Sequence, residues 1–397
     1  MYMKHSLNIV IDANNFYQRT MHSANFTSKK TKFFEEEDAG IYMRKLATDL
    51  TSFLRRFKGV YASVVLCVDS KSWRKTETAL VAADYKGTRK IREEINYPVY
   101  NQVNAEFEAM LAESGVTISK QKGCEADDLI RAWVEYFKAN GSNSIVWSAD
   151  NDLFQLIYKN DESFNVQYYQ PPMQRNSIAA NQEFFDWLDD KDSASNDMSA
   201  EDILFNMTEV TKDSFNGTFK GIMNKTGLKD KLVDPDYVVF GKIIRGDKGD
   251  NIATIKRGIG KVAIESLWES KYSNFKQNDS LNEINRLALI DNLVEMGKIK
   301  NDEAELCAAK LEQNVTMVLL HSDVTPDWVE ANMQNHINET VFTKVDSHTL
   351  TNMKTMLDGT EWFDSSKVNA ATPKHLDPFA NVDVEVKDPI KKTNKLF

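Results

Sequence analysis

The segments LNIVID (residues 7–12), SVVLCVD (63–69) and NSIVWSADND (143–152) decide the fold, because each is an apolar run that leads into aspartate. Short apolar runs rich in β-branched residues predict buried strands. Helical periodicity separates these runs, as at residues 40–58 and 124–139. Alternating strands and helices are typical of a parallel sheet with crossover helices. We therefore predict an α/β fold with a central, mainly parallel, twisted sheet flanked by helices.

Four regions follow from the pattern along the chain. We expect an α/β domain over residues 1–175, with a further strand at 164–170 and a helix that starts in DNDLFQLIY (150–158). Residues 176–235 contain the acidic, Ser-rich stretch DWLDDKDSASNDMSAED and are expected to form an insertion. It is open whether this insertion is a lid, a partner surface or an inert loop. Residues 236–365 show mostly helical signals, and 366–397 lack periodicity and are expected to form a flexible tail.

Composition excludes several classes of protein. No stretch approaches about 20 uninterrupted apolar residues, which argues against a membrane span. The first strand-like run begins at residue 7 and leaves no room for a signal peptide. Only three cysteines are present, in no CxxC pair, which fits reduced thiols in a cytoplasm and makes a zinc site improbable. We expect a cytoplasmic monomer.

Nine acidic residues gather in five short clusters, at positions where a strand is expected to end or a helix to begin. In an open α/β sheet, the carboxyl ends of the strands meet at one crevice. Close carboxylates raise each other's pKa values, and oxygen ligands favour Mg²⁺ or Mn²⁺ as the compensating charge. Each cluster alone also fits simple helix capping. The nine are Asp12, Asp69, Glu125, Asp127, Asp128, Asp150, Asp152, Asp247 and Asp250.

The chemistry that suits such a crevice is phosphodiester hydrolysis assisted by two metal ions. The net charge of −10 argues against a polyanionic partner, but two segments are basic. Residues 71–92 hold seven basic and two acidic residues, and residues 242–261 hold six and two. The glycine-rich GIGK (258–261) would present backbone N–H groups to a phosphate. No G-x-x-x-x-G-K-[ST] phosphate loop is present.

These motifs, in this order, resemble the flap endonuclease/5′-nuclease superfamily, with a PIN-like fold, and above all phage enzymes of the T-even ribonuclease H type. The resemblance covers residues 7–170 and 236–270. It implies a helix–three-turn–helix motif in the helical region and an arch over the active site at about residues 70–98. The motifs are IDANN (11–15), VDS (68–70), YKGTR (85–89), GCEADD (123–128), SADNDL (148–153), GDKGDN (246–251) and GIGK (258–261).

The resemblance also implies roles for individual residues. Asp12, Asp69, Glu125 and Asp127 match the positions that hold the first of two Mg²⁺ ions, with Mn²⁺ able to substitute. The other five acidic residues match the second, outer group, in which some ligands act on the metal through water. A K⁺ ion at the helix–three-turn–helix is a further implication. The catalytic residues would be Lys86, Arg89 and Asp150.

The same resemblance implies contacts with nucleic acid. Lys86 would stabilise phosphate charge, Arg89 would position the strand, and Tyr85 would stack on a base. Trp73 is either an arch aromatic or a core residue. The full expected set is Arg74, Lys75, Tyr85, Lys86, Arg89, Lys256, Arg257, Gly258, Gly260 and Lys261.

We therefore expect a magnesium-dependent 5′ nuclease that acts on 5′ flaps, nicked duplexes or RNA–DNA hybrids in replication or repair. The alternatives are a PIN-type RNase, a non-catalytic structure-specific DNA-binding relative, and an acidic ion-binding scaffold. No EF-hand-like loop supports the scaffold. The basic and then apolar end KKTNKLF (391–397) would suit a sliding clamp or single-strand-binding protein, although a frayed terminus is the expected state.

Overall fold

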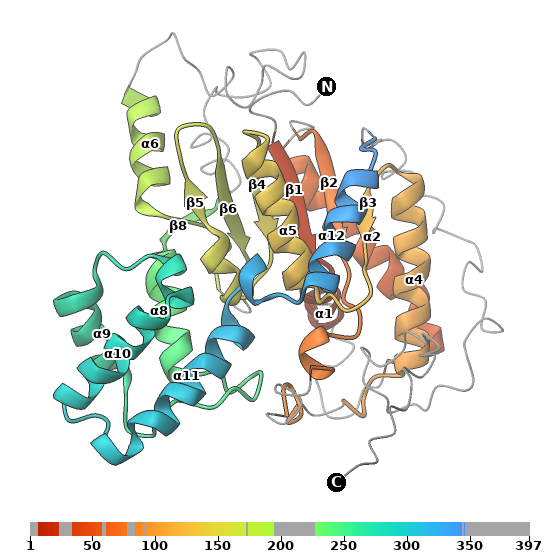
Figure 1. The fold of residues 1–397 in the computed structure, drawn as a ribbon. Coiled ribbons are helices and arrows are strands. Elements are labelled where there is room, and N and C mark those ends of the chain that lie inside the picture. Colours follow the sequence, from red (N-terminus) through yellow and green to blue (C-terminus); the bar gives the residue numbers. More distant parts are fainter. Residues whose placement is uncertain are drawn as a thin grey trace.

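The computed structural model describes residues 7–23, 34–57, 61–77, 84–89, 92–171, 174–193, 227–343 and 345. Within these residues, eight strands form one sheet in the order β3-β2-β1-β4-β6-β7-β8, with β5 paired to β6 (Figure 1). The strands are β1 (Leu7–Asp12), β2 (Ser63–Cys67), β3 (Thr117–Ser119), β4 (Asn143–Trp147), β5 (Tyr158–Lys159), β6 (Phe164–Tyr169), β7 (Ser177–Ala180) and β8 (Lys229–Leu232).

The first five strands in that order, from β3 to β6, run parallel to one another. Pairing of β6 with β5 and β7 is antiparallel, and β8 is parallel to β7. The predicted mainly parallel α/β sheet is therefore confirmed. Because β1 lies between β2 and β4, the carboxyl ends of these three strands lie side by side.

Helices cover both faces of the sheet (Figure 1). Side chains alternate along a strand, so Ile9 and Ile11 of β1 pack with α1, α2 and α4, while Val10 packs with α5 and the C-terminal helices. The helices are α1 (Ala13–Ser23), α2 (Ala39–Arg56), α4 (Tyr97–Glu113), α5 (Ala126–Ala139), α6 (Gln182–Ser193), α8 (Pro235–Arg245), α9 (Lys261–Leu267), α10 (Glu283–Glu295), α11 (Ala304–Val318) and α12 (Asp327–Glu339).

Two expectations need correction. The helix expected from DNDLFQLIY is a short 3₁₀ helix, η3 (Asp152–Leu156), followed by β5, because β5 pairs with β6 in the sheet. The region expected to be an insertion adds β7 and β8 to the sheet, so residue 175 is no boundary of the α/β layer. Residues 78–83 and 90–91 of the expected arch, 194–226 of the insertion and 366–397 of the tail lie outside the described residues.

The C-terminal helices α8 to α11 form a group beside the β6–β8 end of the sheet, and α12 returns along α5 (Figure 1). An ion pair between Arg131 of α5 and Glu330 of α12 links the two parts. The turn after α8 is held by Asn314 of α11, whose side-chain amide donates to the carbonyls of Ile243 and Ala253 at 2.9 Å each. No helix among the described residues is long and apolar enough to cross a membrane.

Gly246 ends α8 with a φ of 68°, a conformation that favours glycine. A methyl group there would lie 2.3 Å from the carbonyl oxygen of Ile252. We expect Gly246→Ala to lower the free energy of unfolding by about 2 kcal/mol or more in a urea titration. Gly260→Ala is the control, because φ there is −87° and no atom lies within 4 Å of the added methyl. Equal stability of both variants would contradict this account of the turn.

Candidate active site

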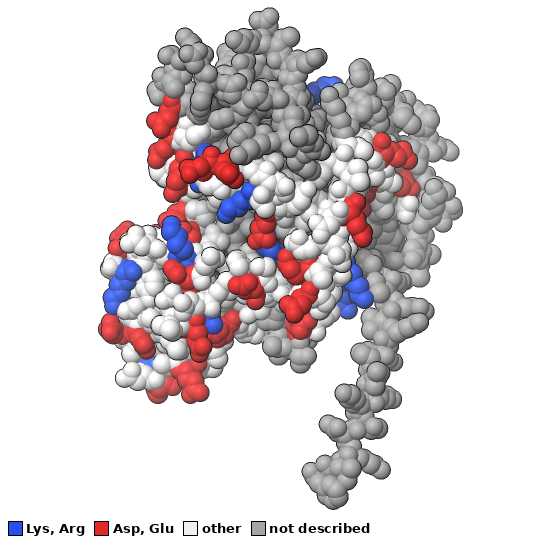
Figure 2. All heavy atoms as spheres, turned by 45° about the horizontal axis from the view of Figure 1, so that its top comes forward, with Lys and Arg blue, Asp and Glu red and all other residues white. Residues whose placement is uncertain are grey.

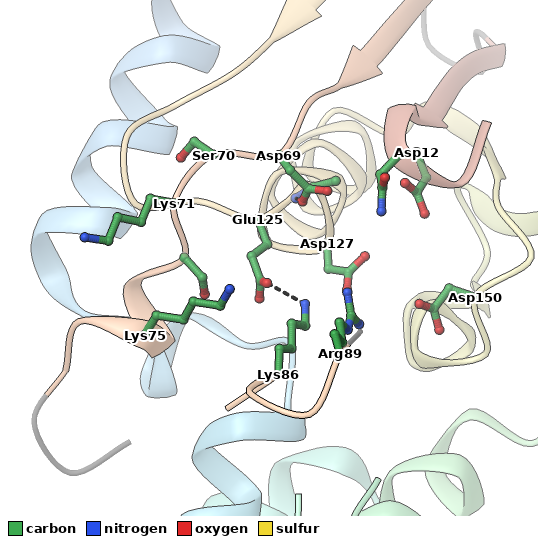
Figure 3. Close-up of a pocket in the computed structure, with 13 residues that line it drawn as sticks. Asp12, Asp69, Ser70, Lys71, Lys75, Lys86, Arg89, Glu125, Asp127 and Asp150 are labelled. Atoms are coloured by element: carbon green, nitrogen blue, oxygen red, sulfur yellow. Dashed lines mark hydrogen bonds and ion pairs between the residues drawn. The ribbon is translucent and has the colours of Figure 1, made fainter. Parts of the chain in front are cut away.

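Five carboxylates line one cavity of about 270 Å³ at the carboxyl edge of the sheet (Figure 3). Asp12 ends β1, Asp69 follows β2, and Asp150 follows β4. Glu125 is the N-cap of α5 and Asp127 lies in its first turn. The strand order explains the convergence, since three neighbouring parallel strands and one helix start deliver these groups to the same place.

Local hydrogen bonds fix the orientation of the innermost carboxylates. Asp12 accepts the backbone N–H of Asn15 at 3.0 Å and the hydroxyl of Ser148 at 2.8 Å. Asp69 accepts the N–H of Ala126 at 2.7 Å. These bonds join the ends of β1, β2 and β4 to α1 and α5, so the scaffold holds the carboxylates in place despite their mutual repulsion.

Burial, and after it the charges of neighbouring carboxylates, raises the pKa values of four of these carboxyls. Burial, followed by the charge of Asp69, raises the pKa of Asp12 to about 7. Burial, followed by the charge of Glu125, raises the pKa of Asp69 to about 6. Burial also raises the pKa values of Asp127 and Asp150. The pocket therefore holds more negative charge than its own surroundings neutralise.

Glu125 behaves differently because cations surround it. Burial alone would raise its pKa, but Lys86 and Arg74 lower it to about 2. Lys86 forms an ion pair with one carboxylate oxygen, drawn as a dashed line in Figure 3. Arg74 lies 3.2 Å from the other oxygen, which also accepts the Tyr85 hydroxyl at 3.0 Å. The ionised Glu125 carboxylate thus holds Arg74, Lys86 and Tyr85 beside the cavity.

Three residues that we expected to bind metal or nucleic acid do not line the cavity. Arg74 is 2% exposed and its guanidinium lies 3.0 Å from Asp128, which is 1% exposed. Asp128 also accepts the N–H of Glu125 and so caps α5 instead of lining the cavity. Tyr85 is 7% exposed and packs in the apolar cluster around α5, which does not favour base stacking. Trp73 is 1% exposed, which makes it a core residue.

The outer acidic residues are already paired with basic groups. Lys242 of α8 contacts both Asp152 and Asp247. Burial would raise the pKa of Asp247, but the hydrogen bond and charge of Lys242, together with backbone hydrogen bonds, lower it. Asp250 pairs with Arg89. These three carboxylates do not line the cavity, so their role as metal ligands, direct or through water, stays a prediction.

Apart from the buried Arg74, the basic residues expected to contact nucleic acid lie in two groups. Lys75, Lys86 and Arg89 line the cavity itself. The second group lies in the turn before α9 or at its first residue, where Lys256 pairs with Glu303 and Lys261 with Glu265. On the face that Figure 2 shows, acidic and basic side chains of the described residues intermix. The second group is Lys256, Arg257, Gly258, Gly260 and Lys261.

Several residues of the site were missed by reasoning from the sequence. Ser148 and Asn15 orient Asp12 and its neighbours, and both lie inside motifs whose aspartates drew attention first. Lys71 lines the cavity beside Lys75. Lys242 holds two carboxylates, and its position five residues before Asp247 in an otherwise apolar helix face was the available signal.

Residues 8–187 match the family model described as 5′-3′ exonuclease, N-terminal resolvase-like domain. These residues, a little under half of the chain, therefore form a domain of the 5′–3′ exonuclease type. The PIN-like fold expected for such a nuclease is the fold observed. A search of curated proteins found no match.

Two solved structures from bacteriophage T5 are similar to the chain. One is the T5 5′-exonuclease with zinc ions bound, at 16% identity and a TM-score of 0.45, covering 88% of this chain and 98% of that one. The other is a T5 flap endonuclease in a pseudo-enzyme–product complex with DNA and metal ions. It has 16% identity and a TM-score of 0.46, covering 88% and 99%.

The donor set of the cavity fits Mg²⁺ or Mn²⁺. The acidic lining of the cavity is made of carboxylates, and no histidine or cysteine lines it among the described residues. A divalent cation would relieve the repulsion that raises the pKa values of Asp12, Asp69 and Asp127. As placed, however, no three acidic, histidine or cysteine side chains in the described part of the chain form a ready-made metal site. Positive charge in the cavity comes from its basic lining residues, Lys71, Lys75, Lys86 and Arg89.

Asp12→Asn should stabilise the protein in excess chelator. Because the folded pKa of about 7 exceeds the ordinary value of 3.8, the protonated form favours folding, and this stability is lost as pH rises from about 4 through 7. The variant should therefore gain roughly 2 kcal/mol over the parent at pH 8 and little at pH 4.5. Thermal unfolding at both pH values measures this, with the exposed Asp161→Asn as control. A gain in stability that is the same at both pH values would contradict a raised pKa of Asp12 in the folded protein.

Arg74→Met should lower the free energy of unfolding by about 3 kcal/mol, because it leaves buried Asp128 and Glu125 without their shared cation. Lys75→Met is the matched control at a half-exposed neighbour and should change stability little. Urea unfolding of both variants gives the comparison. If Arg74→Met kept full stability and lost only DNA affinity, Arg74 would be the nucleic-acid contact that the sequence first suggested.

Proposed function

We propose that the protein is a divalent-metal-dependent 5′ nuclease that hydrolyses phosphodiester bonds at 5′ ends, flaps or RNA–DNA primer junctions. The observation that carries this proposal is one cavity that holds five carboxylates together with Lys86 and Arg89. A phosphodiester brings negative charge, so a purely acidic cavity would repel it, whereas cations at the rim attract it. The match to a 5′–3′ exonuclease family model supports the same reaction class.

Asp12, Asp69, Glu125, Asp127 and Asp150 would hold the magnesium ions. Bound there, the ions would supply a water of lowered pKa and steady the leaving oxygen. The chain's own residues supply the rest of the proposed site. Outer carboxylates Asp152, Asp247 and Asp250 set the charge around it and fix the basic side chains that face it.

Lys86 and Arg89 would act on the scissile phosphate and its neighbour. Lys86 stays protonated because, although burial would lower its pKa, Glu125, Tyr85 and Asp250 together hold the pKa well above the ordinary value. Arg89 is 44% exposed, so its planar guanidinium can turn from Asp250 to the two oxygens of a phosphate. Both groups thus exchange a carboxylate partner for the substrate, and they stabilise negative charge as it develops.

The turn before α9 would contact the duplex part of the substrate. Lys256, Arg257 and Lys261 supply positive charge there, and Gly258 and Gly260 leave backbone N–H groups uncovered by side chains. Within this proposal, a bound K⁺ at the turn is a separate expectation. Contacts of this kind read the phosphate backbone, so recognition would depend on substrate structure and little on base sequence.

A doubly end-labelled 5′-flap duplex and an RNA–DNA primer hybrid test the proposal. With Mg²⁺, we expect cleavage near the 5′ junction that excess chelator abolishes. Asp150→Asn and Lys86→Ala should each lower kcat by about 100-fold or more without loss of folding. Lys276→Ala, which removes an exposed cation distant in sequence from the cavity, is the charge-matched control.

The other outcomes separate the alternatives. Binding of the flap duplex without cleavage in Mg²⁺ or Mn²⁺ would favour a non-catalytic DNA-binding relative. Cleavage confined to single-stranded RNA would favour a PIN-type RNase. Full activity in excess chelator would overturn the metal-dependent reaction.

A further inference from the structure

Two segments far apart in the sequence meet beside the cavity. Residues 84–89 carry Lys86 and Arg89, and residues 246–251 form the GDKGDN turn after α8. The Lys86 backbone N–H donates to the carbonyl of Asp250 at 2.9 Å. The side-chain amide of Asn251 donates to the carbonyl of Asp84, also at 2.9 Å. The two bonds hold Tyr85 from both sides.

The backbone at this contact adopts unusual φ angles. In the described part of the chain, three residues other than glycine have positive φ: Asp84 at 55°, Lys86 at 57° and Asn251 at 60°. All three lie in this one contact. Such conformations are unfavourable for residues with a side chain and persist where surrounding interactions impose them. The structure shows the two hydrogen bonds here, together with contacts of the Asp250 carboxylate with Tyr85, Lys86 and Arg89.

The turn side of the contact is anchored to the rest of the protein. Asp247 and Ile252 exchange two backbone hydrogen bonds, at 2.9 and 2.7 Å. Asn314 of α11 holds the flanking carbonyls of Ile243 and Ala253. The turn is therefore a fixed reference, and Asn251 projects from it to the segment that carries Lys86.

Asn251 does not line the cavity, so any effect on chemistry must pass through another residue. The conformation of residues 84–86 sets the direction of the Lys86 side chain, whose ammonium reaches Glu125. We propose that Asn251 is a positioning residue that ties residues 84–86 to the GDKGDN turn and thereby holds Lys86 at the carboxylate cavity. The consequence for catalysis rests on the proposed nuclease function, whereas the tie itself does not.

Asn251→Gly is the decisive variant, because glycine removes the amide donor and also accepts a φ of 60° without strain. A merely structural role predicts loss of activity together with stability. The positioning role predicts an unchanged melting temperature, an unchanged KM for the flap duplex and a kcat lowered about 10-fold. Asn251→Asp, which keeps the shape but cannot donate, should lower kcat similarly. Asp84→Asn keeps the carbonyl acceptor and should behave like the parent.

A double-mutant cycle with Lys86→Ala tests whether Asn251 acts through Lys86. In that background, Asn251→Gly should cause no further loss of kcat. Full activity of Asn251→Gly alone would overturn the proposal. A kcat of the double variant that falls by the product of the two single losses would also overturn it.

Hydrogen exchange gives a readout that needs no catalysis. The peptide covering residues 84–89 should exchange about 10-fold faster in Asn251→Gly than in the parent or in Asp84→Asn, because without the Asn251 bond the segment opens more often and exposes the Lys86 N–H, which donates to the Asp250 carbonyl. Unchanged exchange would overturn the tie even if cleavage fell. If the parent cleaved no substrate, the nuclease proposal would fail while the exchange result still decided the tie.

Discussion

Mutual repulsion among buried carboxylates is the constraint on which the rest of the site depends. Asp12, Asp69, Asp127 and Asp150 sit at the ends of neighbouring strands or the start of a helix, and burial raises the pKa of each. A fold gains nothing in stability from such a cluster. The scaffold of β1, β2, β4 and α5 must therefore be stable enough from its core packing to impose it, as the two large apolar clusters on the faces of the sheet allow.

Three cations from three segments neutralise part of this negative charge, and their ion pairs also fix the positions of the side chains around the cavity. Arg74 holds the capping pair Glu125 and Asp128 from behind, and Lys86 contacts Glu125 from the cavity side. Lys242 joins η3 to the turn after α8 through its two carboxylate partners. The charge balance thus links the α/β layer with the C-terminal helices, and residues that neutralise the site also position it.

Much of the fold was predictable because buried parallel strands leave uninterrupted apolar runs such as LNIVID. The convergence of Asp12, Asp69 and Asp150 followed from strand order alone. What the sequence could not give was the direction of side chains that lie next to one another in sequence. Asp127 faces the cavity and Asp128 faces Arg74, one position apart on the same helix turn. Likewise, β7 and β8 are short and lack a strong pattern, so only their pairing in the sheet identifies them.

The most direct test of the crowded-charge account is the melting temperature of the full chain as a function of Mg²⁺ at pH 8. A cation that binds the folded carboxylates stabilises by mass action, so the melting temperature should rise and saturate, by about 5 °C at millimolar Mg²⁺. Sodium chloride at matched ionic strength should give little of this rise. Identical melting curves in the two salts would contradict the account.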